Sequence, residues 1–257
     1  MSTDAVARWL AALEARHLRD LTFAEVRRAL QALSSVYVQR RPRLQGGAAL
    51  QGAGKRAAFA LFYGPLHYLA VREVVRALGA ARPPPTEVLD LGCGTGASGA
   101  AWALEAGGVP VQGVDRNGWA VDEARWTLRR LGLRGGADVG RAEEARLPRR
   151  GGAVLAAFTL NELADEARER LLETLLAASG VSVLVVEPIA GRVSPWWPPW
   201  ARRVAEAGGR HDEWRFRVPL PDLVARFDRA AGLDHRELTA RTLWLPAART
   251  RRVGGER

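Results

Sequence analysis

The sequence predicts an α/β protein, with an open and mostly parallel sheet that carries helices on both faces and follows an α-helical N-terminal module. From residue 87 onward, short aliphatic or β-branched runs alternate with amphipathic stretches, which is the pattern of parallel strands joined by crossover helices. Before that point, apolar residues recur at helical spacing. We therefore expect a helical module at residues 1–82, an α/β domain at 83–248 and a frayed tail at 249–257.

The N-terminal module has two local signals of helix boundaries. Thr22 and Glu25 form a capping-box pattern, in which the threonine caps a helix and the glutamate reaches back. Gly64 and Pro65 favour a break inside a later helix, because proline cannot donate a backbone hydrogen bond. The expected helices are residues 4–19, 22–39 and 55–78, with a glycine-rich loop at 44–54.

The α/β part is expected to contain five parallel strands and a C-terminal extension. Residues 195–200 contain too many prolines for a strand interior, so a loop should lead there into a helix near residue 200. The expected strands are residues 87–91, 109–115, 137–141, 153–158 and 181–186. The helices that follow them are residues 97–104, 119–131, 166–178 and 221–231, and a terminal strand pair is expected at 233–238 and 241–245.

The charge of the chain leaves a nucleic-acid partner open. Lysine and arginine number 38 against 28 acidic residues, which gives a formal charge of +10. Lys55 is the only lysine, and such an arginine-rich composition is typical of a GC-rich genome. Codon bias does not explain the excess of basic over acidic residues, so contact with RNA or a ribosome remains an alternative.

Other features of the composition predict a cytoplasmic protein. No run of 18 apolar residues occurs, so no membrane span is expected. The first residues lack the basic start and apolar core of a signal peptide. Cys93 is the single cysteine, which excludes an internal disulfide and a multi-cysteine metal site, so no metal cluster is expected.

The stretch from Glu87 to Gly96 reads as a strand, a glycine turn and the start of a helix, which is a cradle for a ligand with a ribose and an adenine-like base. Gly94 and Gly96 with Gly99 also match the dinucleotide fingerprint. Asp90 argues against a dinucleotide, because a carboxylate at 4 Å would repel each charge of the pyrophosphate by about 4 kcal/mol. An ammonium or a sulfonium would be attracted. S-adenosylmethionine carries both, so the sequence favours this cofactor.

Residues 88–96 resemble motif I of the class I S-adenosylmethionine-dependent methyltransferases. The resemblance implies that the acid ending the second strand holds the ribose hydroxyls, and that the loop after the third strand accepts from the adenine amino group. The segment before the first strand would close over the methionine end of S-adenosylmethionine. The implied cofactor-binding residues are Tyr63, Asp90, Gly92, Cys93, Gly94, Thr95, Gly96, Asp115, Arg116, Ala142, Glu143, Phe158 and Thr159.

The end of the fourth strand faces the reacting methyl group in that fold, and here it is followed by Asn161 and Glu162. Families that methylate exocyclic or amide nitrogens often carry Asn-Pro-Pro-Tyr or Asp-Pro-Pro-Tyr at this point, and this chain does not. We expect Asn161 to orient a nucleophile and Glu162 to act as a base, since methyl transfer mainly needs in-line positioning and removal of a proton. Alternatively, Glu162 interacts with the dipole of the following helix.

A closer resemblance covers about residues 50–190. Residues 55–78, 156–163 and 186–188 are similar to segments of the ribosomal small-subunit methyltransferase-like family, which includes a mitochondrial ribosome assembly factor. The cysteines of its mitochondrial members are absent. The leading expectation is methyl transfer to rRNA or to a target on the small ribosomal subunit. The alternatives are a small-molecule methyltransferase with a helical lid and a non-catalytic RNA-binding assembly factor.

Three tryptophans beyond the fifth strand leave the acceptor undecided. They would stack on a base, wall off a small apolar acceptor, or belong to the core. They are Trp196, Trp197 and Trp200.

Overall fold

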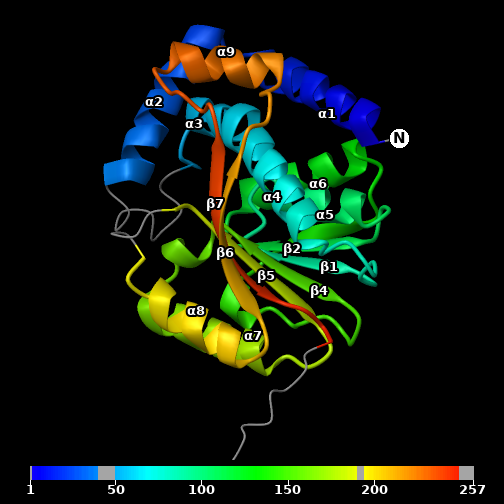
Figure 1. Ribbon diagram of the computed structural model, residues 1–257. Coiled ribbons are helices and arrows are strands. Elements are labelled where there is room, and N and C mark those ends of the chain that lie inside the picture. Colours follow the sequence, from blue (N-terminus) through cyan, green and yellow to red (C-terminus); the bar gives the residue numbers. More distant parts are fainter. Residues whose placement is uncertain (1, 40–49, 190–193, 249–257) are drawn as a thin grey trace, which may run out of the picture.

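A seven-stranded sheet with the order β3-β2-β1-β4-β5-β7-β6 organises the protein (Figure 1). The computed structural model describes residues 2–39, 50–189 and 194–248. Strands β1 to β5 are parallel, whereas β7 runs antiparallel to both β5 and β6. The strands are β1 (Val88–Leu91), β2 (Val111–Asp115), β3 (Gly135–Val139), β4 (Ala153–Ala157), β5 (Ser182–Glu187), β6 (Arg210–Phe216) and β7 (Leu238–Leu245). The predicted α/β fold is confirmed.

The central strands are aliphatic because both of their faces are covered. Every residue of β1 and β4 is buried, and so are all residues of β5 except Ser182. Parallel strands covered by helices on both faces have this near-continuous apolar character. The strand order reverses between β1 and β4, and ligands of open α/β sheets bind at such a switch point beyond the carboxyl ends of the strands.

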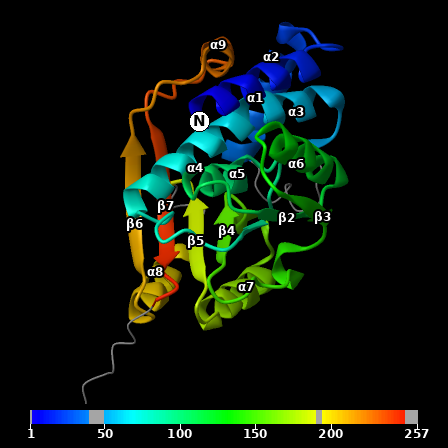
Figure 2. The same cartoon turned by 90° about the vertical axis from the view of Figure 1, so that its right-hand side faces the viewer.

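Helices cover both faces of the sheet (Figure 2). On one face, α4 packs against α5 and α5 against α6, around one large apolar cluster. On the other face, α7 and α8 form a second cluster with β4 and β5. No helix within the described ranges has the length and apolar character that a membrane span requires. These helices are α4 (Gly64–Leu78), α5 (Ala97–Glu105), α6 (Gly118–Arg130), α7 (Asp165–Ala177) and α8 (Trp197–Glu206).

The N-terminal helices share the core of the α/β part. Buried residues of α1 and α2 belong to the same cluster as those of α4 and α5. Phe23 stacks on Phe227 of α9 at 4.3 Å, and His17 contacts the buried carboxylate of Glu123 on α6 at 2.8 Å. The N-terminal helices and the α/β part therefore share one continuous core. These elements are α1 (Ser2–His17), α2 (Phe23–Gln39), α3 (Ala53–Ala58) and α9 (Asp222–Ala230).

The predicted break at Gly64 and Pro65 is wrong. The chain stays helical through a π-helical turn, η3 (Phe59–Tyr63), and Pro65 follows directly as the second residue of α4. A Cβ on Gly64 would lie 2.9 Å from the Thr95 hydroxyl. Glycine therefore allows this helix to approach the turn after β1.

The predicted C-terminal strand pair is also wrong. One strand, β7, replaces the two short strands, and it pairs with β6, which the sequence analysis missed. Strand β6 lies at the sheet edge, and only Trp214 and Phe216 of its residues pack against the core. Its charged residues hide the period-two pattern of apolar residues that predicts a strand. Charged residues are common on edge strands.

The predicted capping box is confirmed and gives a test of local stability. The Thr22 N–H donates to Glu25 Oε2 at 2.8 Å, and the Glu25 N–H donates to Thr22 Oγ1 at 3.3 Å. We expect Thr22→Ala to lower the free energy of unfolding by about 1 kcal/mol in urea denaturation. Thr174→Ala, at an exposed mid-helix position, should change it by less. Equal losses in both variants would contradict the capping role.

Candidate active site

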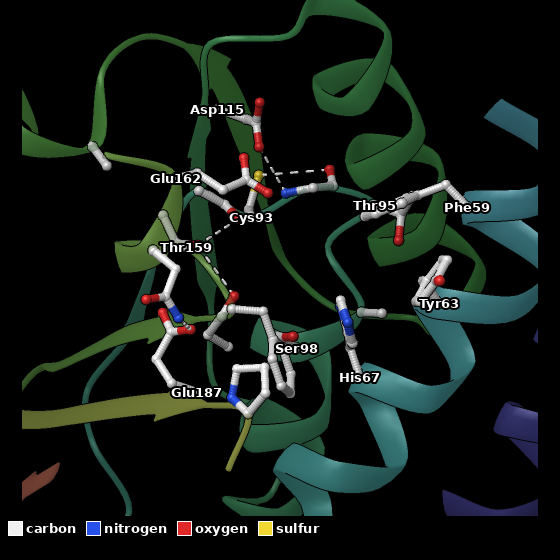
Figure 3. Close-up of a pocket in the computed structure, with 18 of the residues that line it drawn as sticks. Phe59, Tyr63, His67, Cys93, Thr95, Ser98, Asp115, Thr159, Glu162 and Glu187 are labelled. Carbon is white, nitrogen blue, oxygen red and sulfur yellow. Dashed lines mark hydrogen bonds between the residues drawn. The ribbon is translucent and has the colours of Figure 1, made fainter. Parts of the chain in front are cut away.

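A cavity of about 620 Å³ opens beyond the carboxyl ends of β1, β2 and β4 (Figure 3). Its volume falls in the range of ordinary small-molecule sites. The turn after β1, the ends of β2 and β4 and the loop after β3 form one part of its lining. The η3 and α4 helices and the segment before β7 form the rest. The cavity therefore lies at the switch point of the sheet.

The turn after β1 depends on glycine. Gly92 and Gly94 have φ values of +66° and +52°, which other residues rarely adopt. A Cβ on Gly92 would lie 2.3 Å from the Cγ2 of Thr159, at the end of β4. The Thr159 hydroxyl contacts the carbonyl of Leu91 at 3.0 Å. The turn is therefore pressed against β4, and Gly92, Cys93, Gly94 and Thr95 line the cavity.

Gly96 does not line the cavity, unlike the other predicted turn residues. It has a φ of +75° and precedes the first residue of α5. A Cβ at this position would approach the Ala124 backbone of α6 to 3.0 Å. Its role in the structure is thus to let α5 pack closely on α6.

Asp115 lies at the end of β2, with its carboxylate turned toward the turn after β1. Its Oδ2 accepts from the Gly94 N–H at 2.9 Å, and its Oδ1 accepts from the Asn117 N–H at 2.8 Å. A carboxylate has about four acceptor positions, so these two bonds leave capacity for a diol. The neighbouring Arg116 forms an ion pair with Glu162 at 3.8 Å, and Figure 3 shows Glu162 beside Asp115.

The loop after β3 brings Ala142 and Glu143 to the cavity. The Glu143 side chain is nearly buried and accepts from Arg141 Nε at 2.8 Å. Burial alone would raise the pKa of Glu143, but hydrogen bonds from its own N–H and from Arg141 outweigh that effect and hold the pKa below its usual value. The carboxylate can therefore act as an acceptor for an amino group.

The structure corrects the role predicted for Asp90. This residue does not line the cavity but lies behind the turn, 1% exposed, where its Oδ2 accepts from the Gly99 N–H at 2.8 Å. A Cβ on Gly99 would lie 2.7 Å from that oxygen, so the third glycine of the fingerprint serves packing. Asp90 anchors the N-terminal turn of α5. Carboxylates that do line the cavity include Asp115, Glu143, Glu162 and Glu187, and they disfavour a pyrophosphate.

Aromatic side chains form the other half of the cavity. Figure 3 shows Phe59, Tyr63 and His67 along the wall of η3 and α4, on the side opposite Thr159 and Glu187. Phe158 has a φ of +60°, a strained value for a bulky residue that is mostly found at functional sites, and its ring stacks on His67 at 4.1 Å. Burial lowers the pKa of His67 to about 4, so its ring is neutral at pH 7.

Asn161 lines the cavity, but its amide group joins three parts of the fold. Its Oδ1 accepts from Ser194 Oγ at 2.6 Å and from Trp196 Nε1 at 3.0 Å, while its Nδ2 donates to Glu187 Oε2. Glu187 also accepts from the Leu160 N–H. This network gives Asn161 a structural role, because its hydrogen bonds hold the loop after β4 against β5.

The three tryptophans belong to the core. Trp196, Trp197 and Trp200 are 8%, 7% and 2% exposed, and none of them lines the cavity. Arginine guanidinium groups cover their rings, with Arg241 at 4.2 Å from Trp197 and Arg203 at 4.0 Å from Trp200. They therefore offer no surface on which a base could stack.

The C-terminal segment contributes cavity residues that the sequence did not predict. His235, Glu237, Leu238 and Thr239 line the cavity because β7 runs antiparallel and starts at the same sheet edge. One sequence signal was available. Asp228 occupies the apolar stripe of the helix at residues 221–231, where an acid needs a partner.

Within the ranges that the structure describes, no group of three or more histidine, cysteine or acidic side chains is arranged to hold a metal ion. Cys93 is buried in the cavity wall. Burial raises the pKa of its thiol well above the usual value, and the nearby Asp90 and Asp115 add to the effect. The thiol is therefore a weak ligand and a weak nucleophile.

Comparison with known proteins adds the family of the central segment. Residues 88–178 match the family described as methyltransferase domain. No curated protein matches the chain by sequence. Among solved structures, mitomycin 7-O-methyltransferase MmcR has a TM-score of 0.53 at 15% identity, over 93% of this chain and 72% of that one. This similarity supports the fold.

Two further structures resemble the chain less closely. A TehB-like SAM-dependent methyltransferase from Corynebacterium glutamicum has a TM-score of 0.46 at 16% identity, over 84% of this chain and 98% of that one. A SAM-dependent methyltransferase from Geobacter sulfurreducens, in complex with S-adenosyl-L-homocysteine, has a TM-score of 0.44 at 18% identity, over 68% and 90%.

The fold and the matched segment define a class I methyltransferase domain. The matched residues include the glycine turn, Asp115, Glu143 and the end of β4, which line one side of the cavity. The chain therefore contains a methyltransferase domain, and S-adenosylmethionine is the cofactor that this class of domain uses.

The burial of Asp90 predicts a pH-dependent stability. Burial raises its pKa to about 7, so the folded state holds a proton that the unfolded state releases above about pH 4. Stability should therefore fall as the pH rises toward and through 7, at up to about 1.4 kcal/mol per unit. Asp90→Asn can keep the acceptor for Gly99 without the charge.

We expect Asp90→Asn to gain stability relative to the wild type between pH 5 and about 7, measured as urea-denaturation midpoints without cofactor. The exposed Asp122→Asn on α6 is the matched control and should run parallel to the wild type. A constant difference between Asp90→Asn and the wild type across this range would contradict the shifted pKa.

Proposed function

We propose that this chain transfers the methyl group to a compact, planar acceptor enclosed in the aromatic half of the cavity. The observation that supports the proposal most strongly is that one cavity joins the turn at Gly92 and the carboxylate of Asp115 to the aromatic wall at Phe59 and Phe158. Cofactor and acceptor would then meet without leaving the fold. Apolar enclosure with few polar groups is typical of small-molecule sites.

The proposed roles of the nucleotide half follow from its acceptor groups. Asp115 would hold the two ribose hydroxyls with its remaining acceptor positions, and Glu143 or the backbone of Ala142 would accept from the adenine amino group. When bound, S-adenosylmethionine supplies an electrophilic methyl group on a sulfonium. Such a cation is attracted to aromatic rings, and Tyr63 and Phe158 line the cavity.

The neighbours of Phe158 would fix the direction of transfer. Its left-handed backbone turns the chain sharply at the end of β4, and the stack with His67 ties this turn to α4. We assign Phe158 and Thr159 to the wall behind the reacting methyl group. Methyl transfer gains most from such positioning, because the donor is already a good leaving group.

Two classes of acceptor have this compact, planar shape. One is a free small molecule, and the other is a nucleobase that leaves its stack and enters the cavity. The charge of +10 favours the second class, since phosphate contacts need cations. The buried tryptophans favour the first, because they offer no platform for neighbouring bases. We propose the free small molecule, and rRNA of the small ribosomal subunit is the competing target.

The two classes of acceptor differ in where labelled methyl groups accumulate. The protein would be incubated with tritiated S-adenosylmethionine and with three separate acceptor fractions of a cell extract: small metabolites, total RNA with ribosomal subunits, and protein. We expect label in the small-metabolite fraction, and we expect nuclease treatment of the extract to leave it unchanged. Label confined to the RNA fraction, and released from it as methylated nucleosides, would overturn the small-molecule assignment.

A further inference from the structure

The loop between α9 and β7 carries a histidine to the cavity. His235 lies three residues before Leu238, the first residue of β7. Because Arg241 of β7 pairs with Glu187 at the carboxyl end of β5, the start of β7 lies at the sheet edge beyond which the cavity opens. The His235 ring lines the cavity and stands edge-on against Phe62 at 5.7 Å.

A buried carboxylate on α9 holds this histidine at two points. Oδ2 of Asp228 accepts from the backbone N–H of His235 at 3.0 Å, and Oδ1 contacts Nδ1 of its ring at 2.5 Å. The Asp228 side chain is 8% exposed, whereas the His235 side chain is 35% exposed. The acid is thus enclosed by the fold, and the ring is accessible from the cavity.

The contact determines which ring nitrogen carries the proton. An ionised carboxylate only accepts hydrogen bonds, so Nδ1 must donate to Asp228. In the neutral ring the proton then lies on Nδ1, and Nε2 keeps its lone pair. A histidine held in this way can accept a proton at Nε2, as in other enzymes where an acid orients a histidine base.

We infer that His235 is the general base that deprotonates the acceptor, and that Asp228 is the residue that positions it. The acceptor is then a planar molecule with an ionisable O–H or N–H group, which rests on the proposed function above. Its lone pair forms the bond to the methyl carbon while the C–S pair stays on sulfur. Its proton passes to Nε2 of His235 and then to water.

Other polar groups of the cavity suit this role less well. Burial lowers the pKa of His67 to about 4, which makes its ring a weak base at neutral pH. Glu162 pairs with Arg116, and Glu187 accepts hydrogen bonds from the loop after β4. The Asn161 amide has no basic nitrogen. Glu162, the base that the sequence suggested, is replaced by His235 in this assignment.

Asp228→Asn is a sharp test, because the backbone N–H of His235 can only donate. The single amide oxygen of the asparagine should face that N–H, which turns the NH₂ group toward the ring. Nδ1 must then accept, and the ring proton moves to Nε2, where it blocks proton transfer from the acceptor. The substitution keeps the size of the side chain while it reverses the tautomer.

The chain has four histidines, so ¹⁵N spectra of histidine-labelled protein would resolve each ring. We expect the Nδ1–H tautomer for His235 in the wild type and the Nε2–H tautomer in Asp228→Asn. Asp234→Asn, an exposed acid of the same loop that pairs with Arg236, is the matched control and should leave the wild-type tautomer. An Nε2–H tautomer in the wild type would overturn the inference without any acceptor being known.

The rate of transfer tests the catalytic role. With the small-metabolite extract as acceptor, we expect His235→Gln and Asp228→Asn to lower the initial rate by about 100-fold or more. Both variants should bind S-adenosylhomocysteine as tightly as the wild type in calorimetry. His211→Gln, on the exposed edge strand β6, should keep the full rate.

The outcomes separate the inference from the proposed function. Transfer by the wild type and by His235→Gln at equal rates would overturn the role of His235 alone. No transfer by the wild type to small metabolites would overturn the proposed function, and this inference with it. Transfer by the wild type, a loss in both variants and unchanged cofactor binding would support both.

Discussion

The contact between the turn after β1 and the end of β4 is the constraint on which the rest of the site depends. A Cβ on Gly92 would meet Thr159 at 2.3 Å, so two neighbouring parallel strands can end in direct contact only with glycine at this position. The contact places the Gly94 N–H where Asp115 accepts it. Beneath the same turn, Asp90 accepts from Gly99 and fixes the start of α5.

Glycines elsewhere extend this close packing to the helical wall. Gly64 lets the π-helical turn approach Thr95, and that turn carries Phe59 and Tyr63 to the cavity. Phe158 completes the wall at an energetic cost, since its backbone is left-handed and its side chain is large. The stack with His67 on α4 offsets part of that cost. Backbone strain of this kind concentrates at functional sites, which agrees with its place between the two halves of the cavity.

The fold could be predicted from the sequence wherever local patterns carry the information. The alternation of aliphatic strands and amphipathic helices, together with the glycine turn, was enough for the parallel sheet and for the position of Asp115 at the end of β2. The edge strand β6 escaped prediction because its charged residues face solvent and only Trp214 and Phe216 pack inward. The π-helical turn has no local sequence signal of its own.

The sequence indicated one side of the cavity and missed the other. The glycine turn, Asp115 and the loop after β3 directly follow strands, so sequence order alone brings them to the cavity. His235 reaches the cavity only because β7 runs antiparallel to β5, which is a property of the whole sheet. The residue type of Asp90 predicted a contact with the ligand. Asp90 is instead buried behind the turn, where it anchors the start of α5.

The central claim is that Asp115 and the glycine turn form the nucleotide half of one shared cavity. Calorimetric titration with S-adenosylhomocysteine tests it most directly, with the wild type, Asp115→Asn and the exposed control Asp122→Asn compared. The account predicts binding by the wild type and the control, and at least about 10-fold weaker binding by Asp115→Asn, since a hydrogen bond to a charged group contributes about 1.5–3 kcal/mol. Equal affinity for all three proteins, or no binding by the wild type, would contradict it.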